Sequence, residues 1–169
     1  VELINENSLM ESWVNYRLIG KKEIENPGTW TPLPLSYTQE LTEKYNAWLK
    51  KHKSPEELAR MRKEAGVAEG QPIPRLKPGE FPKASRERFH AEATFIMEIE
   101  HNYFEEMKHL LRDEIGVRSI LVGSGDHNDG ISGYPHIRAN MILDVIDGHG
   151  YWQHPRMHGE FRMQNTPMV

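Results

Sequence analysis

Glu6 is the first residue whose type and position could do chemistry. It stands between two amides, Asn5 and Asn7, directly after the short apolar run of residues 1–4. Such a run predicts a strand whose C-terminal end delivers the Glu6 carboxylate into a polar site. A carboxylate held rigidly there can have its pKa raised, as a general acid requires. The same residues are also typical of an ordinary strand that runs into a polar turn.

Two further polar groups follow apolar runs later in the chain. Asp126 to Asp129 come after the run at 117–123, and His149, Tyr151 and Trp152 come after the run at 143–147. Carboxylates, amides and imidazoles can bind sugar hydroxyls, while indole and phenol rings can stack on the flat apolar face of a sugar. We therefore predict a carbohydrate site with Glu6 as its catalytic residue. The predicted substrate-binding residues are Asn5, His127, Asn128, His149, Tyr151 and Trp152.

The nine histidines of the chain allow a second interpretation, a metal site. Asp126, His127 and Asp129, together with His149 and His154, offer nitrogen and oxygen ligands. Their spacing gives such a site little support, so we expect no metal and no other cofactor. A metal-dependent hydrolase that uses Asp126, His127 and His149 stays open as an alternative function.

The elements that must position these residues alternate between strands and helices. Strands are predicted near 1–5, 118–123 and 143–147. Helical spacing of apolar residues predicts the segments between them to be largely helical. The predicted helices are a short one over 8–14, one that begins at Thr38 and includes Leu49, one over 54–66, one over 85–114 and a small one over 135–141. This alternation predicts an α/β fold with parallel strands and right-handed connections.

The helix at 54–66 has the clearest start signal. Ser54 is suited to cap it, Pro55 to occupy its first position and Glu57 to complete a capping box. The helices over about 37–65 have no strand partner, and the proline-rich residues 66–84 are predicted to form a stiff connector. We predict one domain over 1–169, with a helical insertion over about 21–84 that follows the first strand and stands over the site.

Composition excludes several classes of protein. Hydrophobic residues make up 37% of the 169 residues and charged residues 27%, which is typical of a folded globular domain. The net charge of −4 provides no basic surface for nucleic acid. No apolar run approaches the roughly 20 residues that span a membrane. The chain has no cysteine, which excludes disulfides and thiolate metal sites.

The order of two motifs resembles a known family. Asn5-Glu6 at the end of one strand, followed two strands later by Asp147-Gly148-His149-Gly150-Tyr151-Trp152, resembles the clan A glycoside hydrolases, particularly the family-five cellulase and mannanase group. The resemblance implies a partial (β/α)8 TIM barrel covering strands four to six. It also implies a retaining β-glycosidase that acts on a β-linked poly- or oligosaccharide. In that family Glu6 would be the acid/base, Asn5 would bind the 2-hydroxyl, and His149 with Tyr151 would line the cleft.

One departure from the family pattern concerns the nucleophile. Retaining enzymes need a second carboxylate about 5–5.5 Å from the first, and in this family it ends the seventh strand. Glu160 is the one carboxylate side chain after Trp152, and no apolar strand precedes it. A complete barrel needs about 250 residues. We therefore expect a piece of a longer barrel that is inactive without its remainder, and the resemblance implies a secreted or periplasmic location. A carbohydrate-binding barrel without catalysis stays open.

Overall fold

The computed structural model describes residues 1–15, 17–18, 33–125 and 133–149, and these residues are mainly helical. Helices account for 61% of them and strand residues for 2%. Five α-helices are present in this part of the chain: α1 (Leu9–Val14), α2 (Leu35–His52), α3 (Pro55–Ala65), α4 (Arg86–His109) and α5 (Gly133–Asn140). A 3-10 helix, η2 (Pro78–Lys83), precedes α4, and a π-helical turn, η3 (Leu110–Glu114), follows it. No helix of the described residues is long and apolar enough to cross a bilayer.

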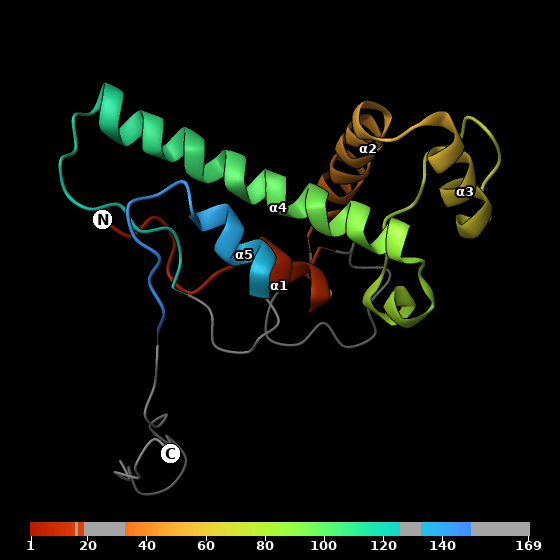
Figure 1. Ribbon diagram of the computed structural model, residues 1–169, viewed down its shortest axis with the longest axis horizontal. Helices are drawn as coiled ribbons and strands as arrows, with labels where there is room; N and C mark the ends of the chain where they lie inside the picture. Colours follow the sequence, from red (N-terminus) through yellow and green to blue (C-terminus); the bar gives the residue numbers. More distant parts are fainter. Residues whose placement is uncertain (16, 19–32, 126–132, 150–169) are drawn as a thin grey trace, which may run out of the picture.

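The long helix α4 organises the molecule (Figure 1). The helices α1 and α5 pack against it, and α2 contacts its central part through Phe95 and Glu98. The extended segments that precede α1 and flank α5 lie toward its C-terminal end (Figure 1). The helices α2 and α3 are therefore separated along α4 from these segments.

Local signals account for most helix ends. Ser54 Oγ accepts a hydrogen bond from the Glu57 N–H, and the Glu57 carboxylate accepts one from the Ser54 N–H, so the predicted capping box of α3 is confirmed. Gly66 ends α3 with a φ of 68°, a conformation that glycine adopts without strain. Ser85 caps α4 through its Oγ, which accepts a hydrogen bond from the Arg88 N–H at 3.2 Å. The helix α2 begins at Leu35 instead of Thr38, directly after Pro34.

The larger hydrophobic core joins α1, α2 and α3 to the first half of α4. It also includes Ile73 and Leu76 from the proline-rich connector, and the Trp13 indole N–H donates to the Leu76 carbonyl oxygen at 3.2 Å. Trp13 therefore packs in the core. The buried residues of this cluster are Met10, Trp13, Leu18, Tyr45, Leu49, Met61, Ile73, Leu76, Ala91, Phe95 and Ile96.

A buried ion pair fixes the connector to α4. The Glu92 carboxylate, fully buried, accepts hydrogen bonds from Arg75 Nε at 3.0 Å and from the Leu76 N–H at 2.6 Å. Burial raises the pKa of Glu92 to about 7, although the Arg75 guanidinium acts in the opposite direction. Removing either partner would leave a charged group buried without its counterpart.

A smaller cluster lies between the second half of α4, α5 and three extended segments. Its buried members are Phe104, Leu121, Ala139 and Leu143, and Leu3, Ile4, Leu111, Val117 and Ile142 pack against them. Through Leu3 and Ile4 it anchors the segment at the N-terminus.

The predicted α/β fold with a partial (β/α)8 barrel is wrong for this structure. The segments near 1–5, 118–123 and 143–147 do lie parallel and side by side, but they are joined only by isolated bridges, Glu2–Val122 and Val122–Val145. Typical contacts are the Leu3 N–H to the Val122 oxygen at 2.9 Å and the Asp144 N–H to the Leu121 oxygen at 3.2 Å. The described residues contain no sheet.

The uncovered side of these segments explains the difference. Parallel sheets are stable when helices cover both faces. Among the described residues α4 and α5 cover one side, and Val1, Ile120 and Val145 remain 55%, 60% and 46% exposed. The three apolar runs therefore form extended segments that are joined by a few backbone hydrogen bonds.

Candidate functional site

Glu6 and His149 meet although they lie 143 positions apart in the chain. Glu6 Oε1 is 2.7 Å from His149 Nδ1. Two backbone contacts bring them together: the Ile4 N–H donates to the Gly123 oxygen, and the His149 N–H donates to the Gly125 oxygen, both at 3.0 Å. The parallel order of the three segments thus places the end of the first beside the end of the third.

The backbone at Glu6 has an unusual conformation. Its φ is 43°, in the left-handed region that side chains with a Cβ rarely adopt. The next residue, Asn7, donates its N–H to Ser124 Oγ at 2.9 Å. This hydrogen bond fixes the backbone directly after Glu6. Such conformations persist where surrounding contacts fix them, and they occur often at functional sites.

Gly125 makes room for the His149 ring. A Cβ at this position would lie 2.4 Å from His149 Cδ2 and 2.5 Å from Nε2, far inside van der Waals contact. The neighbouring Gly123 is equally restricted, because a Cβ there would lie 1.8 Å from the Asn140 side-chain oxygen. The ring of His149 can therefore approach the loop only because residue 125 is glycine.

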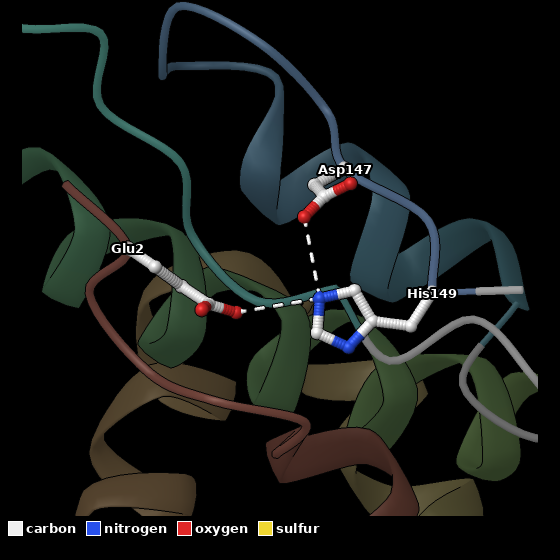
Figure 2. A group of neighbouring side chains, drawn as sticks. All are labelled: Glu2, Asp147 and His149. Atoms are coloured by element: carbon white, nitrogen blue, oxygen red, sulfur yellow. Dashed lines mark ion pairs between the residues drawn. The ribbon is translucent and has the colours of Figure 1, made fainter.

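Carboxylates surround the His149 imidazole. Asp147 Oδ2 lies 3.2 Å and Glu2 Oε1 lies 3.8 Å from Nε2 (Figure 2). Glu6 Oε1 lies 2.7 Å from the other ring nitrogen, Nδ1. The hydrogen bond to Glu6 raises the pKa of His149, and the charges of Asp147, Glu6 and Glu2 act in the same direction. The side chain of His149 is 23% exposed and that of Glu6 is 34% exposed, so the pair is accessible to a small molecule.

A buried polar network lies next to this site and joins the helices around it. Glu100 on α4 accepts a hydrogen bond from the Leu9 N–H at 2.8 Å, and its other oxygen lies 3.1 Å from His136 Nδ1. His136 on α5 is completely buried. These contacts connect the start of α1, which follows Glu6 closely, to both α4 and α5.

Asn140 continues the network to the loop that carries Gly125. Its side-chain oxygen accepts from the Ser124 N–H at 3.1 Å, and its amide nitrogen donates to the His136 carbonyl oxygen at 2.8 Å. Ser124, Glu100, His136 and Asn140 are not among the site residues predicted from the sequence. The four-residue spacing of His136 and Asn140, and the position of Glu100 on the buried face of α4, were the available signals.

The structure brings together only some of the predicted site residues. Glu6 and His149 are in contact, and Asn5 lies exposed beside Glu6. Asp126, His127, Asn128, Tyr151 and Trp152 fall outside the described residues, so their predicted roles stay predictions.

Comparison with known proteins provides no family for the chain. No family model, no curated protein and no solved structure matches it. The resemblance to glycoside hydrolases therefore depends on the motifs at Asn5-Glu6 and Asp147–Trp152 alone.

Proposed function

We propose that this chain carries the acid/base site of a glycoside hydrolase of the retaining β type, with Glu6 as the acid/base. The observation that supports this most is the 2.7 Å contact between Glu6 Oε1 and His149 Nδ1. It joins the two motifs on which the resemblance depends. It also occurs at an accessible position and at a residue with a left-handed backbone.

The pair suits proton transfer to a departing oxygen. In the first step of a retaining mechanism a carboxylic acid protonates the leaving group, and in the second step the carboxylate takes a proton from water. The hydrogen bond to Glu6 raises the pKa of His149. In its protonated form Glu6 gives its proton to the glycosidic oxygen, and the contact with His149 fixes the orientation of the carboxyl group.

Asn5 has a separate role in the proposal. Its side chain is exposed and directly precedes Glu6, so its amide can bind a sugar hydroxyl next to the bond that breaks. Hydrogen bonds to the 2-hydroxyl strengthen in the transition state of this reaction. The substrate class is a β-linked poly- or oligosaccharide, with Tyr151 and Trp152 as the residues that stack on sugar rings.

Substitution of Glu6 by Gln in the natural gene product tests the assignment. Turnover of a β-linked oligosaccharide should fall by about 10²–10⁴-fold, because nothing protonates the departing oxygen. An aryl β-glycoside with an activated leaving group needs little protonation, so its first step should be affected much less. Azide should then restore turnover and yield a glycosyl azide of retained configuration.

Glu114→Gln is the matched control, since Glu114 is an exposed carboxylate at the end of η3. It should leave hydrolysis unchanged. If Glu6→Gln hydrolyses the natural oligosaccharide within a few-fold of the parent, Glu6 is not the acid/base. If the parent binds β-linked oligosaccharides at Asn5 but hydrolyses neither substrate, the protein binds carbohydrate without catalysis.

A further inference from the structure

Two carboxylates from different segments converge on one nitrogen of His149. Asp147 Oδ2 is 3.2 Å and Glu2 Oε1 is 3.8 Å from Nε2, and the three ligand atoms all lie within 4.8 Å of one another. Figure 2 shows Glu2 and Asp147 reaching the same ring atom from two sides. The pairing of the extended segments creates this arrangement, because Glu2 belongs to the first segment and Asp147 to the third.

The spacing suits a tetrahedral metal ion. Zinc binds histidine nitrogen and carboxylate oxygen at about 2.0–2.2 Å, so neighbouring ligand atoms in a tetrahedral site lie about 3.3 Å apart. The 3.2 Å and 3.8 Å distances at His149 are close to this value. The side chains of Glu2 and Asp147 are 34% and 45% exposed, which leaves them free to adjust and leaves room for water as a fourth ligand.

Glu6 contacts the other nitrogen of the His149 ring, Nδ1, at 2.7 Å. When Nδ1–H donates to the Glu6 carboxylate, the lone pair of a neutral imidazole is on Nε2, facing two carboxylates that can only accept. Three acceptors facing one another require a cation between them, which is either a proton on Nε2 or a metal ion. A carboxylate behind a metal-binding histidine is a common supporting arrangement in metal sites.

A histidine beside two carboxylates is not sufficient for a metal site, and His109 is an example. Asp113 Oδ2 lies 2.6 Å from its Nδ1, whereas Glu114 Oε1 lies 3.8 Å from its Nε2. The two carboxylates occupy opposite sides of the ring and cannot bind one ion together with either nitrogen. Its side chain is also 65% exposed. His109 is therefore an internal comparison for His149.

We propose that Glu2, Asp147 and His149 Nε2 bind a divalent cation of the zinc type, with Glu6 holding the ring by Nδ1. A site of one nitrogen and two oxygens favours zinc over calcium or magnesium, which prefer oxygen ligands alone. The site goes beyond the proposed hydrolase activity, because its ligands do not include Glu6 and its occupancy is measured without a sugar.

Calorimetric titration of the chelator-treated protein with zinc chloride tests the proposal. We expect one ion per chain, no comparable binding of calcium or magnesium, and a shift of the His149 Nε2 resonance in ¹⁵N spectra. Glu2→Gln and Asp147→Asn should each weaken zinc binding at least tenfold. Glu6→Gln should weaken it about 10–100-fold, because a neutral amide replaces the carboxylate that supports the ring. His109→Ala is the matched control and should leave the affinity unchanged.

Both amide variants keep the size of the side chain at accessible positions, and circular dichroism verifies that they fold. Absence of stoichiometric zinc binding overturns the proposal and assigns the cation at Nε2 to a proton. Binding that survives Glu2→Gln and Asp147→Asn, or that disappears in His109→Ala, also overturns it. Loss of hydrolysis in Glu6→Gln with zinc still bound would support both proposals, while zinc binding without any hydrolysis would contradict the proposed function alone.

Discussion

The two hydrophobic clusters of this molecule are organised in opposite ways. The larger one is made of helices whose ends are set by neighbours in the chain, such as Ser54 with Glu57. The smaller one depends on segments more than a hundred positions apart, such as Leu3 beside Val122, and leaves one side of them exposed. The larger cluster thus forms a helical body whose elements are specified locally, whereas Glu6 and His149 lie at the ends of the extended segments that pack on the smaller cluster.

The largest effect is expected in the helical body, at Glu92. Glu92→Ala leaves Arg75 and the Leu76 N–H buried without their acceptor, and the free energy of unfolding should fall by about 3–5 kcal/mol. Urea denaturation at pH 8, where the carboxyl is ionised, measures it. Glu87→Ala removes an exposed pair with Arg60 and should change stability far less. Equal effects of the two variants would contradict the role of the buried pair.

Leu121→Ala tests whether the second cluster opens independently. Leu121 is completely buried, and its truncation should lower the free energy of unfolding by about 2–3 kcal/mol, at the low end for leucine because the surroundings can collapse. Hydrogen exchange should accelerate at the Leu3 and Ile4 amides but not in α3. Uniform acceleration in both places would show that the two clusters open as one unit.

Gly125→Ala should displace the His149 ring. The new Cβ would overlap the imidazole, so the variant should lose about 1–2 kcal/mol of stability and the contact with Glu6. The His149 side-chain resonances report the movement. Gly70→Ala is the control: its φ of 80° also disfavours alanine, but nothing lies within 4 Å of the new Cβ. It should therefore leave the His149 signals in place.

The smallest expected effect is the dependence of stability on pH through the titration of His149. Because the pKa of His149 is raised in the folded protein, mainly by the hydrogen bond to Glu6, its contribution to stability is fully present below the ordinary histidine pKa. That contribution is lost as the pH rises through the raised value. An NMR titration of the metal-free protein should show the raised pKa, and Glu6→Gln should lower it. An unchanged His149 titration in Glu6→Gln would contradict the pairing.

The sequence predicted the helices well because their signals are local. The capping box at Ser54, the serine before α4 and the apolar spacing of α2 each act within a few residues. The proximity of Glu6 and His149 followed from the parallel order of the segments that carry them. The helix signals lie within a short stretch of chain, whereas the meeting of Glu6 and His149 depends on segments far apart in the sequence.

The lack of a sheet among the described residues and the presence of the buried network could not be predicted, for a different reason. The run at 118–123 has the same composition whether it joins a sheet or lies extended, and the outcome depends on whether other elements cover both its sides. The burial of Glu100 and His136 depends on how α4 and α5 pack, which neither helix specifies alone. Whether a charged residue on an apolar helix face, such as Glu100, becomes part of a buried network depends on the residue that packs against it.

Because Glu6 has a left-handed backbone, stability and the proposed activity favour different amino acids at this position. Glycine has no steric cost there, and for other residues that cost is about 1–2 kcal/mol. A library selected only for heat resistance should therefore replace Glu6 with glycine, while one selected for activity should retain the glutamate. The amino acid that survives at residue 6 would record which of the two demands governed the selection.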